Sequence, residues 1–131
     1  MAQTGERPNV DATEREALHE LQLGIEHVHR AYGHLLAFHH QIGRGMDRFA
    51  AAEPLLRETK HGALADGIRD EILPAGVIGD QWSYELVEAF ERGFLVETAG
   101  FERRVREEVA SGVAHVAERE QQREWRERAR R

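Results

Sequence analysis

Apolar residues recur every three or four positions through the first third of the chain. They are Leu18, Leu21, Ile25, Val28, Tyr32, Leu35, Ile42, Met46 and Phe49, with a single seven-residue gap that has His39 in its middle. Such heptad spacing places the apolar side chains on one stripe of a helix of the coiled-coil type. It predicts one helix over about residues 11–50, roughly 60 Å long at the usual rise per residue. Asp11 and Glu14 have the spacing of a capping box at its start.

Shorter helices are predicted after this long one. Pro54 suits the first position of a new helix, and Lys60-His61-Gly62 suits a basic last turn closed by a glycine. Helical spacing resumes over 63–73, either as a separate helix or as one helix interrupted at Gly62. The run 74–79 is rich in glycine and begins with proline, so it predicts a firm break, and Asp80 suits the N-cap of the next helix.

Two more apolar stripes follow this break. The first shares one helix face, with Trp82 expected as its core anchor: Trp82, Leu86, Ala89, Phe90, Gly93 and Val96. The helical phase then slips across residues 97–100, where we expect a kink or a short turn. The second predicts one final helix: Phe101, Val105, Val109, Gly112 and Val116.

These patterns predict an all-α fold, a helical bundle of four to five helices with a long N-terminal helix over about 11–50. No segment alternates with a period of two, so a sheet is not expected. We predict a disordered N-terminus over 1–10, a single helical bundle domain over 11–117 and a charged helical tail over 118–131. A helix over 11–50 is too long for its short partners to cover. It therefore bends around them or pairs with a second copy, and we expect a homodimer through this first helix.

Composition excludes several classes of function. The 131 residues contain no cysteine, which rules out disulfides, thiolate zinc sites, iron–sulfur clusters and thiol catalysis. No secretory signal and no apolar run of about 20 residues is visible, so we expect a soluble, cytoplasmic protein without a membrane partner. A formal net charge of −6 argues against nucleic acid as a partner, because phosphate contacts need basic surfaces.

Histidine is the chemical oddity of this sequence. The chain has 8 histidines, six of them between positions 19 and 40, and imidazole serves in metal ligation and proton transfer. Glu26-x-x-His29 has the Glu-x-x-His spacing of carboxylate-bridged di-iron bundles, although no second such pair occurs. The candidate metal ligands are Glu26, His29, His39 and His40 on the first helix, and His115 from another helix. The competing interpretation has no cofactor, with Glu26 solvated beside a half-buried His29.

His39 needs its own explanation because it lies within the apolar stripe of the first helix. One interpretation is a core histidine that hydrogen-bonds a backbone carbonyl or Tyr32. The other brings His39 of two copies together at a dimer interface, where one polar core residue can set register and oligomeric state. Protonation would then separate the helices, and the dimer would dissociate between about pH 7 and pH 5.

No catalytic constellation is visible. The two serines, Ser83 and Ser111, have no nucleophile-elbow context, and the glycines form no phosphate-binding loop. We therefore expect a non-enzymatic interaction or scaffolding protein that acts as a homo-oligomer. The arginine-rich tail with Trp125 is a candidate surface for a protein partner. The alternative is a ferritin-like or hemerythrin-like metal-binding or redox protein that holds iron, zinc or manganese at its histidine cluster.

The block from His61 to Phe94 contains several short runs that are similar to those of known proteins. It contains Leu64-Ala65-Asp66, Arg69-Asp70-Glu71, Leu73-Pro74 and Gly79-Asp80-Gln81-Trp82-Ser83-Tyr84-Glu85-Leu86-Val87. This block resembles small helical proteins of haloarchaea that have no assigned function. The resemblance implies a halophilic archaeal origin and a cytoplasmic location, and it implies no activity.

Overall fold

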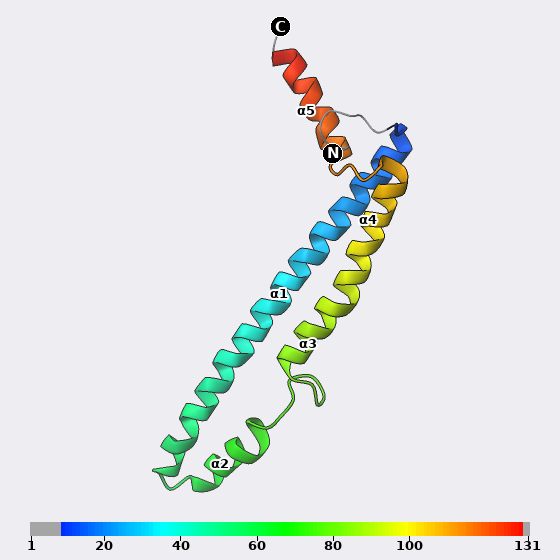
Figure 1. Cartoon of the computed structure of the whole chain (residues 1–131). Helices are drawn as coiled ribbons and strands as arrows, with labels where there is room; N and C mark the ends of the chain where they lie inside the picture. The colour runs from blue at the N-terminus through cyan, green and yellow to red at the C-terminus, as the bar shows by residue number, and fades with distance from the viewer. Residues whose placement is uncertain (1–8, 130–131) are drawn as a thin grey trace. The chain divides into compact units, whose positions relative to one another are not determined.

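The computed structural model describes residues 9–129, and every regular element within them is helical. In chain order these elements are α1 (Ala12–Arg57), α2 (Gly62–Gly67), the π-helical segment η1 (Ile68–Ile72), α3 (Ser83–Phe90), the π-helical segment η2 (Glu91–Leu95), α4 (Val96–Ala110) and α5 (Val116–Ala129) (Figure 1). The predicted all-α class with a long N-terminal helix is confirmed. Residues 1–8 of the predicted disordered N-terminus lie outside the described residues, as do residues 130–131 of the predicted tail.

The described residues form two compact units. One unit contains residues 9–30 and 94–129, and the other contains residues 31–93. We call them the terminal unit and the middle unit. Helix α1 supplies residues to both. The predicted division into a domain over 11–117 and a tail over 118–131 stays a prediction.

The start of α1 has the capping box that the sequence predicts. The backbone N–H of Glu14 donates to Oδ1 of Asp11 at 2.8 Å, and the backbone N–H of Asp11 donates to Oε1 of Glu14 at 2.9 Å. These bonds satisfy two of the donors that a helix N-terminus leaves without partners. Asp11 is therefore confirmed as the N-cap.

The end of α1 differs from the prediction. The helix continues past residue 50 and through Pro54 to Arg57, so the expected new helix at Pro54 is wrong. Proline lacks the backbone N–H and its ring crowds the carbonyl four residues earlier, so it disfavours a helix interior. The helix nevertheless continues for about one turn past Pro54 before it ends. Arg57 then bonds Glu53 and Oδ1 of Asp66, each at 2.8 Å. Gly62 begins α2 and does not close the preceding helix.

The break between η1 and α3 is confirmed, and two glycines shape it. A Cβ on Gly76 would lie 2.5 Å from the backbone carbon of Asp80, and Gly79 has a φ of +58°. The close approach at Gly76 therefore requires glycine, and the left-handed φ of Gly79 favours it. Asp80 is not the N-cap of α3. The cap is Trp82, whose backbone N–H donates to Oε1 of Glu85 at 2.8 Å.

The segment from Ser83 to Ala110 explains the slip in helical phase. No kink or turn lies at 97–100, which is α-helical within α4. The slip occurs earlier, in η2, where a wider π-helical turn inserts extra residues without breaking the helix. The predicted single final helix is also wrong. Helix α4 ends at Ala110, because Ser111 and Gly112 have φ angles of 53° and 82°, and α5 is a separate helix.

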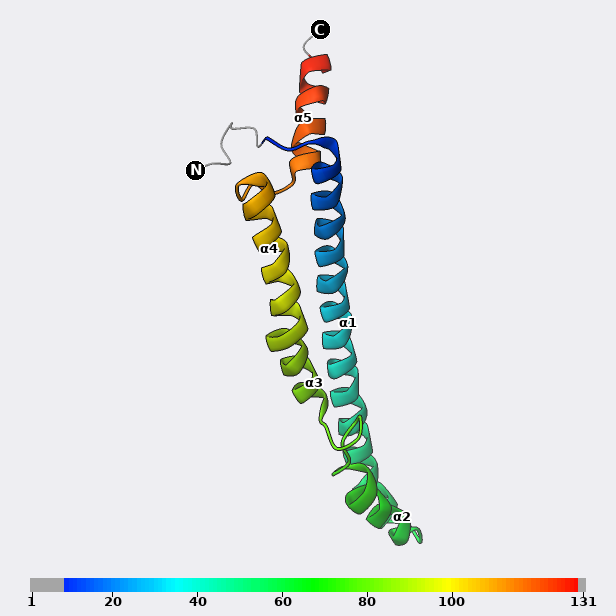
Figure 2. The same cartoon turned by 90° about the vertical axis from the view of Figure 1, so that its right-hand side faces the viewer.

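The terminal unit holds a small core where α4 gives way to α5. Its buried residues are Leu18, Ala110, Val113 and Val116, with Val10, Val105 and Val109 packed against them. Figures 1 and 2 both show α4 running beside the N-terminal part of α1. The connection after Ala110 brings Val113 and Val116 onto Leu18. Of these two valines only Val116 belongs to the predicted final stripe, and the turn in the chain buries it together with Val113.

Candidate interaction surface

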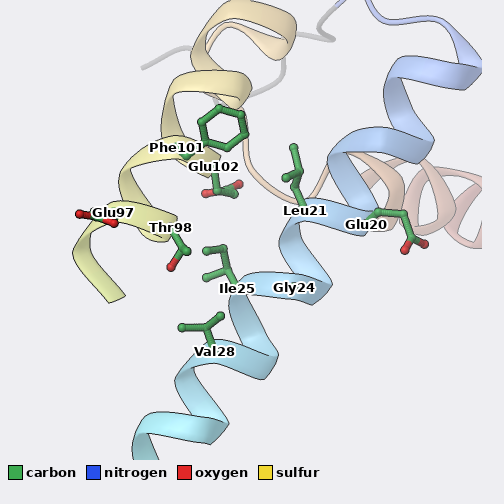
Figure 3. A pocket seen from close by; sticks show the side chains of 9 residues that line it. All are labelled: Glu20, Leu21, Gly24, Ile25, Val28, Glu97, Thr98, Phe101 and Glu102. Atoms are coloured by element: carbon green, nitrogen blue, oxygen red, sulfur yellow. The ribbon is translucent and has the colours of Figure 1, made fainter. Parts of the chain in front are cut away.

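An apolar groove lies between α1 and α4 within the terminal unit. Its volume is about 440 Å³, and it is lined by Glu20, Leu21, Gly24, Ile25, Val28, Glu97, Thr98, Phe101 and Glu102. Figure 3 shows Leu21, Ile25 and Val28 of α1 directed toward α4. These three residues belong to the heptad stripe, which predicts that they face inward. The stripe does not predict that α4 leaves part of this face open. The chain therefore presents an apolar surface that the described residues do not cover.

Carboxylates mark the edges of this groove. Glu102 is paired with Arg106, whose Nη1 lies 3.1 Å from its Oε1. Glu20 and Glu97 form no ion pair with any described residue, and no arginine or lysine lines the groove within this part of the chain. The groove thus combines an apolar floor with an acidic margin. Such a surface favours an occupant that is apolar at its centre and basic at its edge.

Large hydrophobic side chains are poorly covered throughout the described residues. None of them is fully buried, and Phe101 at the groove is 50% exposed. Phe94 and Trp82 are 53% and 40% exposed, so the prediction of Trp82 as a core anchor is wrong. Trp82 instead lines a pocket of about 180 Å³ in the middle unit together with Met46 and Phe49. Exposed apolar surface on this scale is typical of proteins that bind a partner through it.

The structure distributes the predicted metal ligands over both units. Glu26, His29 and His115 belong to the terminal unit, and His39 and His40 belong to the middle unit. His29, His40 and His115 are exposed, and His115 lies in the turn before α5 with a φ of 57°. Glu26 is half-buried and faces Arg30, with 4.0 Å between its Oε1 and the guanidinium Nη2.

No group of three or more histidine, aspartate or glutamate side chains is arranged to hold a metal ion within residues 9–129. Among the predicted ligands, the rings of His39 and His40 have their centroids 5.7 Å apart. A metal site at these residues remains a prediction from the sequence.

His39 has a partner that the sequence did not indicate. Its Nδ1 lies 2.7 Å from Oγ of Ser83, in place of the backbone carbonyl or Tyr32 that the sequence suggested. Ser83 is 7% exposed and is the first residue of α3. The chain has only two serines, but this scarcity does not indicate which residue of α1 either serine would contact. The pairing of His39 between two copies stays a prediction.

Tyr32 holds α1 against the end of α3 in the same unit. Its ring stacks on Phe90 with centroids 6.1 Å apart, and its hydroxyl donates to Oε2 of Glu91 at 2.9 Å. This hydrogen bond raises the pKa of Tyr32, with smaller contributions from burial and from the negative charge of Glu91.

Comparisons with protein-family models, with curated proteins and with solved structures find no match to this chain. Within the described residues, no helix is both long enough and apolar enough to cross a membrane.

Proposed function

We propose that this protein is a non-enzymatic interaction protein that acts as a homo-oligomer, with α1 as its principal contact surface. The observation that carries the proposal is the apolar groove beside α1, which the described residues leave open. Two helices packed side by side cover only part of each apolar stripe, and a further layer of helices is needed to bury the rest. A second copy of the same chain provides that layer without any other partner.

The arrangement of polar groups supports a binding role over a catalytic one. The hydrogen bond between His39 and Ser83 joins two helices. Within residues 9–129 no carboxylate hydrogen-bonds His39, so the pair lacks the third group that orients a catalytic histidine. The pair is therefore best explained as a structural contact.

We propose α5 as a second contact surface, for a protein partner. Trp125 is 57% exposed on this helix, which is otherwise composed almost wholly of charged and amide side chains. An exposed tryptophan among arginines is a common anchor of protein interfaces. Removal of residues 118–131 is expected to leave homo-oligomer formation unchanged, because the groove lies outside this segment.

Sedimentation equilibrium of the full chain tests the main proposal. We expect the mass of a dimer, or of a higher oligomer, at a concentration of about 10 μM, which corresponds to an affinity typical of specific association. A monomer mass up to about 500 μM would contradict the proposal, because apolar surface on this scale would then be exposed without a partner of the same kind.

A further inference from the structure

We propose that the groove between α1 and α4 receives residues 38–52 of α1 from a second copy of the chain, in antiparallel orientation. In this arrangement Gly24 of one copy lies against Gly45 of the other. The inference rests on the proposed homo-oligomer and specifies its interface. The charges of the groove and the spacing of glycines along α1 both match that segment.

The charges of the groove and of this segment are complementary. The groove has the carboxylates of Glu20 and Glu97 at its margins. The segment carries Arg44 and Arg48, one helical turn apart, and a single carboxylate, Asp47, so its net charge is positive. Neither arginine forms an ion pair with any residue between 9 and 129. Charge complementarity selects partner and orientation. An acidic peptide or an anionic lipid surface is disfavoured by the same carboxylates.

The segment also has an apolar face to fill the groove. Phe38 and Phe49 are 36% and 48% exposed, and both lie within residues 38–52 of α1. In the register described below, the ring of Phe49, which also lines the pocket beside Trp82 of its own chain, comes next to Leu21 of the second copy. Burying this ring there removes apolar surface from water on both partners.

Gly24 and Gly45 define the register. They are three heptads apart on one α-helix, which separates them by about 60° round the helix axis, so a single helical partner can contact both. A Cβ added to either would meet no atom within 4 Å, so packing within the chain does not require either glycine. A glycine inside a helix destabilises it by about 1 kcal/mol relative to alanine. Close approach of a second helix backbone is a physical reason for glycine at both sites.

This register closes a dimer with two-fold symmetry. An antiparallel pairing that sets Gly24 against Gly45 of the second copy also sets Gly45 against Gly24, so both grooves are filled at once. The same register places the exposed ring of Phe38 over the small side chain of Ala31 from the other copy. It also brings Glu20 next to Arg48 of the second copy, and this contact occurs twice.

Charge reversal tests these contacts on the full chain by sedimentation equilibrium. Glu20→Arg alone and Arg48→Glu alone each place like charges together at two positions, and each is expected to weaken the dimer at least ~10-fold. The double variant Glu20→Arg/Arg48→Glu restores opposite charges and is expected to return to within ~3-fold of the native affinity. An equimolar mixture of the two single variants is expected to form a heterodimer, because each chain then complements the other.

Filling the groove gives a test that does not depend on charge. Gly24→Leu places a side chain where the second helix would approach and is expected to weaken the dimer at least ~10-fold. Gly33→Leu is the matched control. It lies about 180° round α1 from Gly24 at 100° per residue and is also open within the chain, so the dimer is expected to persist. Circular dichroism verifies that both variants keep their helix content.

The outcomes separate this inference from the proposed function. If the native chain is a dimer and Gly24→Leu and both charge reversals leave its affinity unchanged, the interface is elsewhere. The inference is then overturned while the homo-oligomer stands. If the single reversals weaken the dimer and the double variant does not recover, the register is wrong. A monomeric native chain overturns both proposals.

Discussion

Nδ1 of His39, in the middle of α1, lies 2.7 Å from Oγ of Ser83 at the first position of α3. Ser83 is 7% exposed, so its hydroxyl has little access to water and depends on this hydrogen bond. His39 interrupts the apolar stripe of α1 at the point where α3 begins beside it. The polar residue in the stripe and the buried serine thus satisfy each other.

Removal of either partner is expected to destabilise the protein. Ser83→Ala leaves the half-buried imidazole without its partner, and we expect a loss of about 1–2 kcal/mol in the free energy of unfolding. His39→Ala is expected to lower the free energy of unfolding further, because packing is removed together with the hydrogen bond. Urea denaturation at a fixed protein concentration measures the free energy of unfolding of both variants. His40→Ala is the control, since His40 is exposed, and equal effects of His39→Ala and His40→Ala would argue against a specific role for the pair.

The ionisation of Tyr32 is expected to report its contact with Glu91. The hydrogen bond to Glu91 raises the pKa of Tyr32, followed by burial and by the charge of Glu91. A raised pKa means that the folded state favours the protonated phenol. Its stabilising contribution is complete below the ordinary tyrosine pKa and is lost as pH rises through the raised pKa of Tyr32.

A titration followed by phenolate absorbance tests this assignment. The chain has 2 tyrosines, so Tyr84→Phe leaves Tyr32 as the single chromophore of this kind. Adding Glu91→Ala is expected to move the Tyr32 midpoint down toward the ordinary value. An unchanged midpoint would mean that Glu91 does not contact Tyr32 in solution.

Alanine substitution at two glycines is expected to change the free energy of unfolding in opposite directions. Gly76→Ala places a Cβ 2.5 Å from backbone of Asp80 and is expected to lower the free energy of unfolding by about 1–3 kcal/mol. Gly43→Ala lies inside α1 with nothing within 4 Å and is expected to raise it by about 0.5–1 kcal/mol. Thermal denaturation of both variants measures these changes in stability. A stabilising Gly76→Ala would show that the turn before α3 has another conformation.

The small core of the terminal unit is expected to be sensitive to truncation at Leu18. This residue is 7% exposed and packs with Val113 and Val116. Leu18→Ala is expected to cost about 2–4 kcal/mol, through lost burial and the cavity left behind. Leu64→Ala, at a residue that is 61% exposed, is expected to change stability by less than about 0.5 kcal/mol. Chemical denaturation distinguishes the two, and similar values for both would place Leu18 outside the core.

Part of the candidate surface was predictable from residue types along the helix. The stripe through Leu21, Ile25 and Val28 identifies the inward face of α1, because helical periodicity alone determines which side chains share a face. The position of α4 determines that this stretch stays open and that Glu97 and Phe101 border it. The spacing of residues within α1 does not indicate where α4 packs.

The sequence by itself determined what depends on neighbours along the chain. Periodicity established the all-α class and the length of the first helix to within two turns, the Asp11–Glu14 spacing established its cap, and proline and glycine established the break after η1. Only the tertiary structure decided that the phase slip is a π-helical turn, that α4 ends at Ala110, and that His39 bonds Ser83. The hydrogen bond of His39 joins residues 44 positions apart in the chain, and the energy of such a contact is absent from any local window of sequence. Tertiary contacts override local preferences where the two differ.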